Sequence, residues 1–505
     1  MIQQPAKLGL YLLYLALMAG LVAWLILPAA PAGFDWDDTW YLWMAEWYSG
    51  RSEHRDVAWM MMHTRQYPPL FPFLLSLSGE VLIGHAAGLV MNALFLAAAV
   101  TVALAWLLDR GMPMLGALAG SLVIAVNPVS LEFIPTLMSE PLFLLLTTGA
   151  LALACRGSTG WRTWLAIGLL AGLSVATRSA GWALVAGLMI SLLAGDGRAR
   201  LKFFLPGLLL GLLVHFGLKS GLPAAHSYLE GFAENRGNIN AAYLLDQLRA
   251  IWAGWSAVWG SVPFALAMGL LVLPGLALGL KRGRAEAWYV LVSILMLLAW
   301  PFPGQMGRFL WVLLPAALAL VPLSVSLLPY PAVSKSAPTV VLVLALVLSI
   351  PGGLWRTVDR LGNPPGDGLD DLSRLADWTR PEDRQTALMN LRVRRALLDD
   401  ADKISGLTGN MQCIYSELPA LVSIRSKRIS FASPWNSLED FAPDSRACRY
   451  YYLVPGALPG ADAQAVQQFS DHYQELFRSS APWDETGELA LGVFYRLDVK
   501  PEIAD

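Results

Sequence analysis

Runs of about twenty apolar residues recur through the first 354 residues, and they constrain the fold more than any other feature. A helix needs about 20 such residues to cross the hydrocarbon core of a bilayer. Of the 74 charged residues (38 acidic plus 36 basic), 34 lie in this segment and 40 in the last 151 residues. The first segment is therefore suited to lipid and the last segment to water.

We predict an α-helical polytopic membrane protein with about eleven transmembrane helices in residues 1–354 and a small soluble α/β domain in residues 355–505. The first span, Leu8–Leu27, is followed by a polar segment and not by a small-residue cleavage site, which indicates a retained helix. The other spans are predicted at about 85–108, 113–130, 138–155, 163–178, 180–195, 201–219, 255–280, 286–301, 308–328 and 338–354.

The orientation follows from basic residues in short loops, which stay in the cytoplasm. With eleven spans, these residues all fall on one side: Lys7, Arg110, Arg156, Arg162, Arg198, Arg200, Lys202, Lys281, Arg282, Arg284 and Lys335. The pattern predicts a bacterial inner (plasma) membrane protein with a cytoplasmic N-terminus and a periplasmic or extracellular C-terminal domain. No Lys/Arg-dense stretch indicates a nucleic-acid partner.

The outer loop at residues 28–84 has an aromatic character. Trp36, Trp40, Trp43 and Trp47 recur every three or four residues, so on a helix they form one stripe suited to a membrane interface. We therefore expect short interfacial helices in this loop.

Acidic residues stand at two outer boundaries of the predicted spans. Asp35, Asp37 and Asp38 lie within four residues, where they repel one another and raise one another's pKa values; a cation or a basic catalytic role would justify this arrangement. The alternative is that Asp37 or Asp38 caps the helix that follows. Glu140 begins the fourth span, where an ionisable group marks a functional candidate. Its alternative role is to favour the helix N-terminus electrostatically.

Basic residues are few on the same outer side. Four arginines are the exceptions: Arg65, Arg178, Arg236 and Arg308. Arginine binds phosphate oxygens in a bidentate manner, so together they suit a phosphate-bearing lipid, whereas any one alone could simply extend to the interface. His63, with Asp37 and Asp38, leaves a divalent metal site open as an alternative, although a lone histidine is a weak indication.

Short motifs along residues 8–330 resemble the GT-C superfamily of membrane glycosyltransferases, in particular the branch with protein O-mannosyltransferases and the aminoarabinose transferase that acts on lipid A. The similar stretches, in chain order, are DDTWY (37–41), YPPL (67–70), SEP (139–141), TRSAG (177–181), GFAENRGN (231–238) and GRFLWVLLP (307–315). IYSELPALVSIRSKRI (414–429) also resembles a small exported domain found on bacterial members.

The resemblance implies an enzyme, a hexosyl- or pentosyltransferase, that moves a sugar from a polyprenyl-phosphate donor to a glycan, lipid or protein acceptor at the outer membrane face. It implies Asp37 as the general base, Asp38 as a second acidic position for the acceptor or a metal, and Glu140 as the acidic residue of the second outer loop. Arg65, Tyr67, Arg178, Arg236 and Arg308 become candidates for donor and lipid-phosphate binding. The implied partners are the donor, the acceptor and membrane lipids.

The sequence departs from the branch at two positions. Gln66 and Tyr67 precede Pro68, and Arg178 stands at the later turn, where several relatives carry lysines. The donor sugar therefore stays open. The rival class is a secondary transporter or a flippase of lipid-linked sugars, and the third alternative is a structural subunit. Transporters usually carry internal repeats and midplane ionisable groups, and neither is evident here.

The last 151 residues have a mixed pattern. GNPPGDG (362–368) marks a loop, RYYYLVPG (449–456) and LGVFYRLDV (491–499) are typical of strands, and AVQQFSDHYQELF (465–477) has helical spacing. Cys413 and Cys448 could pair if this domain is exported, but their spacing alone does not decide it. Acceptor docking, regulation and packing all remain open as its role.

Overall fold

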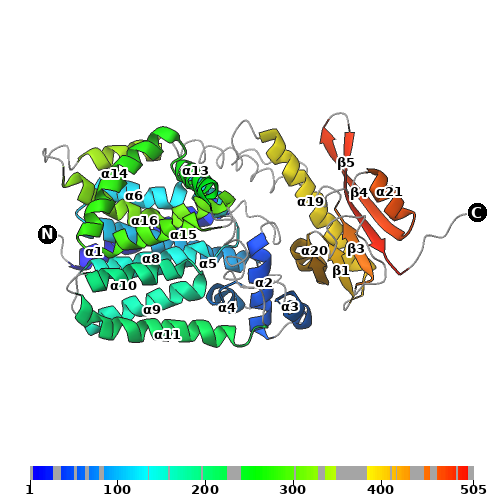
Figure 1. Cartoon of the computed structure of the whole chain (residues 1–505), viewed down its shortest axis with the longest axis horizontal. Coiled ribbons are helices and arrows are strands. Elements are labelled where there is room, and N and C mark those ends of the chain that lie inside the picture. The colour runs from blue at the N-terminus through cyan, green and yellow to red at the C-terminus, as the bar shows by residue number, and fades with distance from the viewer. Residues whose placement is uncertain are drawn as a thin grey trace, which may run out of the picture.

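The computed structural model describes residues 4–26, 36–50, 54–62, 67–78, 85–134, 136–156, 160–194, 197–223, 240–300, 303–327, 336–347, 384–409, 412–416, 418–432, 448–454, 463–484 and 487–498. The predicted domain boundary near residue 355 lies outside these ranges. Figure 1 shows helices gathered on one side and a small mixed α/β unit on the other. This arrangement agrees with the predicted fold class.

Each of the eleven predicted spans overlaps a helix, and residues 348–354 of the last predicted span lie outside the described ranges. Five are long and apolar enough to cross a membrane: those in α1 (Gln4–Ile26), α5 (His85–Asp109), α11 (Leu201–Lys219, with the turn before it), α14 (Val262–Lys281) and α16 (Met306–Val325). The others are shorter: α6 (Met114–Val126), α8 (Glu140–Cys155), α9 (Trp161–Thr177), α10 (Gly181–Ala194), α15 (Ala285–Leu298) and Ser336–Val347.

One predicted span begins too early. The span expected at 255–280 includes the end of α13 (Ala241–Val258), and α14 starts only at Val262. Between them Gly260 adopts φ +68°, a left-handed conformation that glycine tolerates and that ends the first helix. The apolar run thus contains a turn that hydropathy alone does not reveal.

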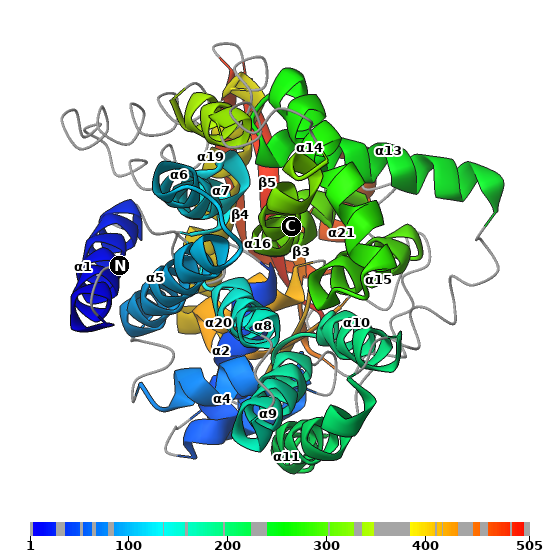
Figure 2. The same cartoon turned by 90° about the vertical axis from the view of Figure 1, so that its left-hand side faces the viewer.

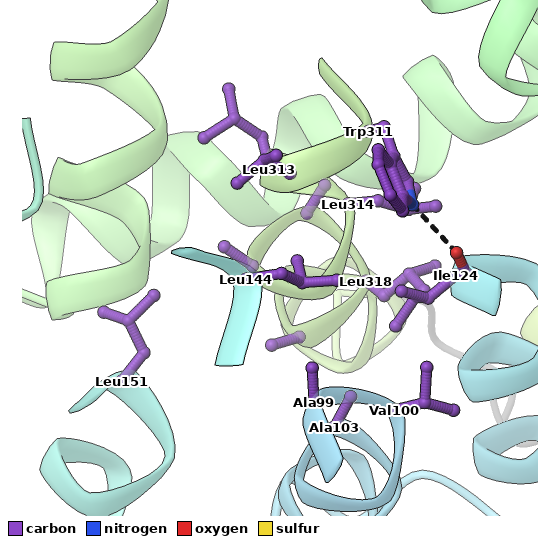
Figure 3. Packing of buried hydrophobic residues seen from close by; sticks show 14 of the residues in the cluster. Ala99, Val100, Ala103, Ile124, Leu144, Leu151, Trp311, Leu313, Leu314 and Leu318 are labelled. Atoms are coloured by element: carbon purple, nitrogen blue, oxygen red, sulfur yellow. Dashed lines mark hydrogen bonds between the residues drawn. The ribbon is translucent and has the colours of Figure 1, made fainter. Parts of the chain in front are cut away.

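Helix α16 is the centre of the helical bundle (Figure 2), and 89% of its most apolar stretch of 18 residues is buried. Apart from Arg308 and Ser324, its residues are apolar on every side, as expected for a helix surrounded by protein. In Figure 3, Leu318 of α16 lies near Ala99 and Ala103 of α5, whose small side chains leave room for it. Trp311 donates from Nε1 to the carbonyl of Ile124 at 2.8 Å, which satisfies a polar group inside the bundle.

Glycines bring α9 and α11 into direct backbone contact. A Cβ built on Gly172 would lie 2.8 Å from the Cα of Gly211, and one built on Gly211 would lie 2.7 Å from the Cα of Gly172. Gly168 and Gly207 are equally close to the opposite backbone. Small residues at helical spacing allow such an approach between membrane helices. This packing fixes the end of α9, directly before Arg178.

The loop at 28–84 contains the short helices that we predicted: α2 (Trp36–Ser49), α3 (Arg55–Met62) and α4 (Leu70–Ser76). The environment predicted for the tryptophan stripe was wrong, however. Trp40 and Trp43 are buried inside the protein, and Trp47 packs on Trp59 with ring centroids 4.7 Å apart. Protein contacts replace the membrane interface because α3, α4 and the C-terminal unit cover the stripe.

The C-terminal unit is a five-stranded mixed sheet with strand order β2-β1-β3-β5-β4. Its elements are α19 (Arg384–Leu407), β1 (Cys413–Ser416), α20 (Pro419–Ser426), β2 (Ile429–Ala432), β3 (Tyr450–Leu453), α21 (Ala463–Ser470), β4 (Gln474–Asp484) and β5 (Gly487–Arg496). Strand β1 pairs parallel with β2 and β3, whereas β5 pairs antiparallel with β3 and β4.

Two of the predicted strands are confirmed as β3 and β5, but the predicted helix at 465–477 is only half correct. Helix α21 ends at Ser470, and the chain enters β4 at Gln474 because pairing with β5 overrides the helical spacing. Cys413 and Cys448 form a disulfide that joins β1 to the residues before β3. The sequence left open whether these two cysteines pair, and the structure shows that they do.

The two parts of the molecule meet at α2. Trp43 donates from Nε1 to Ser423 Oγ of α20 at 2.9 Å, and both side chains are buried. Ile429 of β2 belongs to the same apolar cluster as Trp43, and Lys427 lies close enough to Glu46 to affect its pKa. Helix α2 is thus held between the bundle and the C-terminal unit (Figure 1).

Candidate active site

The first turn of α2 places two carboxylates at the bundle. Asp37 keeps 13% of its side-chain surface exposed. One of its oxygens accepts a hydrogen bond from the Tyr67 hydroxyl at 2.6 Å, and the other lies 2.6 Å from Nη2 of Arg308. Asp38 is buried and accepts from Thr39 Oγ1 at 3.2 Å. Both residues lie inside the helix, so neither is the residue that precedes and caps it.

The first turn of α8 supplies the third carboxylate. Glu140 exposes 1% of its side chain, and its Oε1 pairs with Arg178 Nη1 at 2.8 Å and with Arg308 Nε. Its Oε2 is buried and has no hydrogen-bond partner among the described residues. Glu140 does lie at the start of a helix, as the alternative interpretation held. A favourable charge at a helix N-terminus does not, however, require the two arginines that pair with it.

Arg308 lies near the start of α16, with 5% of its side chain exposed, and it connects Asp37 with Glu140. Arg178 follows the end of α9 and also donates from Nη1 to Ser139 Oγ at 3.0 Å. Among the described residues, Arg178 forms its polar contacts through Nη1 alone, which leaves Nε and Nη2 for an oxygen ligand. The cluster therefore combines arginines able to bind an anion with carboxylates able to accept a proton.

Several positions of the cluster were predicted from the sequence. The structure brings together Asp37, Tyr67, Glu140, Arg178 and Arg308, which come from five separate segments. Asp38 lies beside them with its side chain turned into the protein. Asp35, His63, Arg65 and Arg236 lie outside the described residues. In the described part of the chain, no three His, Cys, Asp or Glu side chains form a group that could hold a metal ion.

Two further residues of the cluster were missed. The Tyr41 hydroxyl lies 2.8 Å from Ser139 Oγ, and Ser139 in turn accepts from Arg178. Both belong to motifs noted above, DDTWY and SEP, so their place in those motifs was the available signal. Tyr41 and Ser139 thus help to hold Nη1 of Arg178, the same nitrogen that pairs with Glu140.

Electrostatics keep Asp37 ionised. Burial raises the pKa of the Asp37 carboxyl, but Arg308, the Tyr67 hydrogen bond and Arg178 lower it more, so the pKa lies below the ordinary value of an aspartate. Burial, and then the negative charge of Asp37, raise the pKa of the Tyr41 hydroxyl to about 12. Asp37 is thus the ionised acceptor and Tyr41 the neutral donor at ordinary pH.

The chain shares its overall fold with a protein of known structure, ArnT. Two crystal structures of ArnT from Cupriavidus metallidurans, one bound to undecaprenyl phosphate and one in the apo state, match 97% of this chain and 98% of their own, with TM-scores of 0.55 and 0.54. The sequence identity is 12% in both, so the likeness concerns the fold. No family model and no curated protein sequence matches the chain. The ArnT-like fold and the apolar helices make this an integral membrane protein.

Loss of Arg308 should be costly because it removes the ion pair of Asp37 and leaves the buried Glu140 with Arg178 as its one remaining cation among the described residues. We expect Arg308→Gln to destabilise the protein by about 3–5 kcal/mol, seen as a lower thermal unfolding midpoint in detergent. The matched control is Arg249→Gln, whose partner Asp246 is 67% exposed; it should change stability by at most about 0.5 kcal/mol. Equal midpoints for the two variants would contradict the bridging role of Arg308.

Proposed function

We propose that the protein is a glycosyltransferase that moves a sugar from a polyprenyl-phosphate donor to an acceptor hydroxyl. The observation that carries the proposal is the buried cluster in which Arg308 and Arg178 lie beside the ionised Asp37. The fold of ArnT, one structure of which holds undecaprenyl phosphate, supports a lipid-linked donor. The sugar and the acceptor stay open.

The cluster provides the groups that such a transfer needs. The acceptor oxygen attacks the anomeric carbon of the sugar, and Asp37 takes the proton from the acceptor hydroxyl. The bond between that carbon and the phosphate oxygen breaks, and its electron pair stays on the phosphate. Arg178 and Arg308 stabilise the charge that develops there, as guanidinium groups do for phosphate oxygens. Glu140 holds both guanidinium groups in place and acts through them.

The arginines also explain how a weak base could become competent. In the ion-paired arrangement, Arg308 lowers the pKa of Asp37 and makes it a poor proton acceptor. When Arg308 turns its hydrogen bonds toward a phosphate oxygen, that influence on Asp37 weakens and its pKa rises. The donor phosphate would thereby activate the base that serves the acceptor.

The orientation proposed from the basic loops has further support. Helix α8 begins at Glu140 and ends at Cys155, next to Arg156, so the cluster and the basic residues lie at opposite ends of one helix. Disulfides persist in oxidising compartments outside the cytoplasm, and the Cys413–Cys448 bond belongs to the unit that contacts α2. We therefore place the cluster and the C-terminal unit on the outer face of a bacterial inner membrane, and the N-terminus in the cytoplasm.

Cysteine alkylation tests this orientation. The chain has three cysteines, of which Cys155 alone is free, so denatured cell extracts should take up one maleimide before reduction and three after it. Cys155→Ser, the matched variant, should take up none and then two. Mass spectrometry counts the labels, and three labels before reduction would place the C-terminal unit in the cytoplasm.

Replacement of the proposed base tests the enzyme function. We expect Asp37→Asn to lower transfer about 10²- to 10⁴-fold, measured with labelled polyprenyl-phosphate sugars and purified protein in liposomes. Asp56→Asn, at an exposed position of α3, should transfer as the wild type does. Undiminished transfer by Asp37→Asn excludes Asp37 as the base. Failure of the wild type to consume any donor, together with movement of donor across the bilayer, would instead favour a flippase.

The pH profile reports the pKa of Asp37 in the free enzyme. Because that pKa lies below the ordinary value of an aspartate, kcat/KM should show no acid limb from Asp37 above about pH 5. Tyr67→Phe removes a hydrogen bond that lowers the pKa, so the acid limb should move to higher pH in this variant. Initial rates over the pH range in both proteins provide the comparison, and an unmoved limb would mean that another group titrates.

A further inference from the structure

A pocket lies at the end of the bundle remote from the carboxylate–arginine cluster. It has a volume of about 220 Å³, and Cys155, the last residue of α8, lines it. Glu140 is the first residue of that helix, so the two sites are separated by about 22 Å at 1.5 Å per residue. The pocket is therefore a site of its own.

Three arginines from three different turns line this pocket: Arg110 after α5, Arg200 before α11 and Arg284 before α15. Among the described residues that line the pocket, Glu286 is the single carboxylate, and it pairs with Arg110. The positive charges of Arg200 and Arg284 therefore exceed the negative charge that these residues supply. In the part of the chain that the structure describes, neither Arg200 nor Arg284 forms an ion pair with a carboxylate. The pocket thus carries a net charge suited to an anion.

Arg110 provides evidence that the pocket is built to bind. Its side chain is 8% exposed, and its Nε is buried with no hydrogen-bond partner among the described residues. A buried guanidinium N–H without an acceptor is costly, so the fold keeps Arg110 at the pocket at a cost in stability. The Cζ of Arg200 lies 5.2 Å from the centroid of the Trp164 ring, which limits the positions its charge can take.

The basic loop residues that orient a membrane protein do not explain why three arginines line one pocket. Loop arginines that only orient a membrane protein extend into water, as the exposed Arg198 and Arg282 do on the same two turns. Arg200 and Arg284 are instead half-buried and line the cavity together with Arg110. Basic pockets between membrane helices bind the phosphate of anionic lipid head groups.

We propose that this pocket binds a phosphate group, with Arg110, Arg200 and Arg284 as its ligands. The phosphate could belong to an anionic phospholipid of the adjacent leaflet or to a soluble phosphate, and the chemistry of recognition is the same in both cases. The volume is many times the space that one water needs, so a phosphate group fits.

The free thiol of Cys155 provides a readout that needs no enzyme activity, because it lines the pocket and is partly exposed. We would measure its alkylation by uncharged N-ethylmaleimide in full-length protein. One arm uses nanodiscs of phosphatidylcholine with added inorganic phosphate, and the other uses nanodiscs containing phosphatidylglycerol without it. Bound phosphate should slow alkylation by the factor 1 + [L]/Kd, or about tenfold at ten times Kd.

The matched variants separate specific binding from surface charge. Arg200→Gln with Arg284→Gln should abolish the slowing, whereas Arg198→Gln with Arg282→Gln changes the same charge on the same turns and should retain it. Slowing by inorganic phosphate identifies a soluble ligand, and slowing by phosphatidylglycerol alone identifies a lipid head group. Absence of slowing in the wild type with both probes, or equal slowing in the two double variants, would overturn the proposal.

Discussion

The arrangement of the candidate site depends on the ion pairs that Arg308 forms. It starts from the central helix α16 and connects Asp37 on α2 with Glu140 on α8, so one guanidinium fixes three helices relative to one another. Buried ion pairs of this kind stabilise a fold little more than apolar residues of the same shape would. Stability alone therefore does not account for two carboxylates and two arginines gathered at this position, and their presence supports the proposed chemistry.

Helix α2 connects the carboxylate–arginine cluster to the C-terminal unit. One end of α2 carries Asp37, and further along Trp43 and Glu46 meet the C-terminal unit at Ser423 and Lys427. Burial, with some help from Arg425, lowers the pKa of the Lys427 ammonium to about 8, while Glu46 acts in the opposite direction. The C-terminal unit thus forms the support behind α2, a packing role that the sequence left open beside acceptor docking and regulation.

The sequence predicted the features that depend on local composition. Apolar runs predicted where the long helices of the bundle lie. The short motifs contained the residues that meet in the cluster: Asp37, Tyr67, Glu140, Arg178 and Arg308. Features that depend on distant partners were predicted less well. The tryptophans of α2 look interfacial until the C-terminal unit is placed on them, and residues 474–477 have helical spacing until β5 pairs with them.

The hydrogen bond between Trp43 and Ser423 spans 380 residues of sequence. During synthesis at about 5–20 residues per second, the partner of Trp43 is therefore made roughly 20–80 seconds after it. In that interval α2 lacks its outer support, and its buried tryptophans have no C-terminal unit to cover them. The support behind α2 is consequently made last, roughly 20–80 seconds after the helix that carries Asp37.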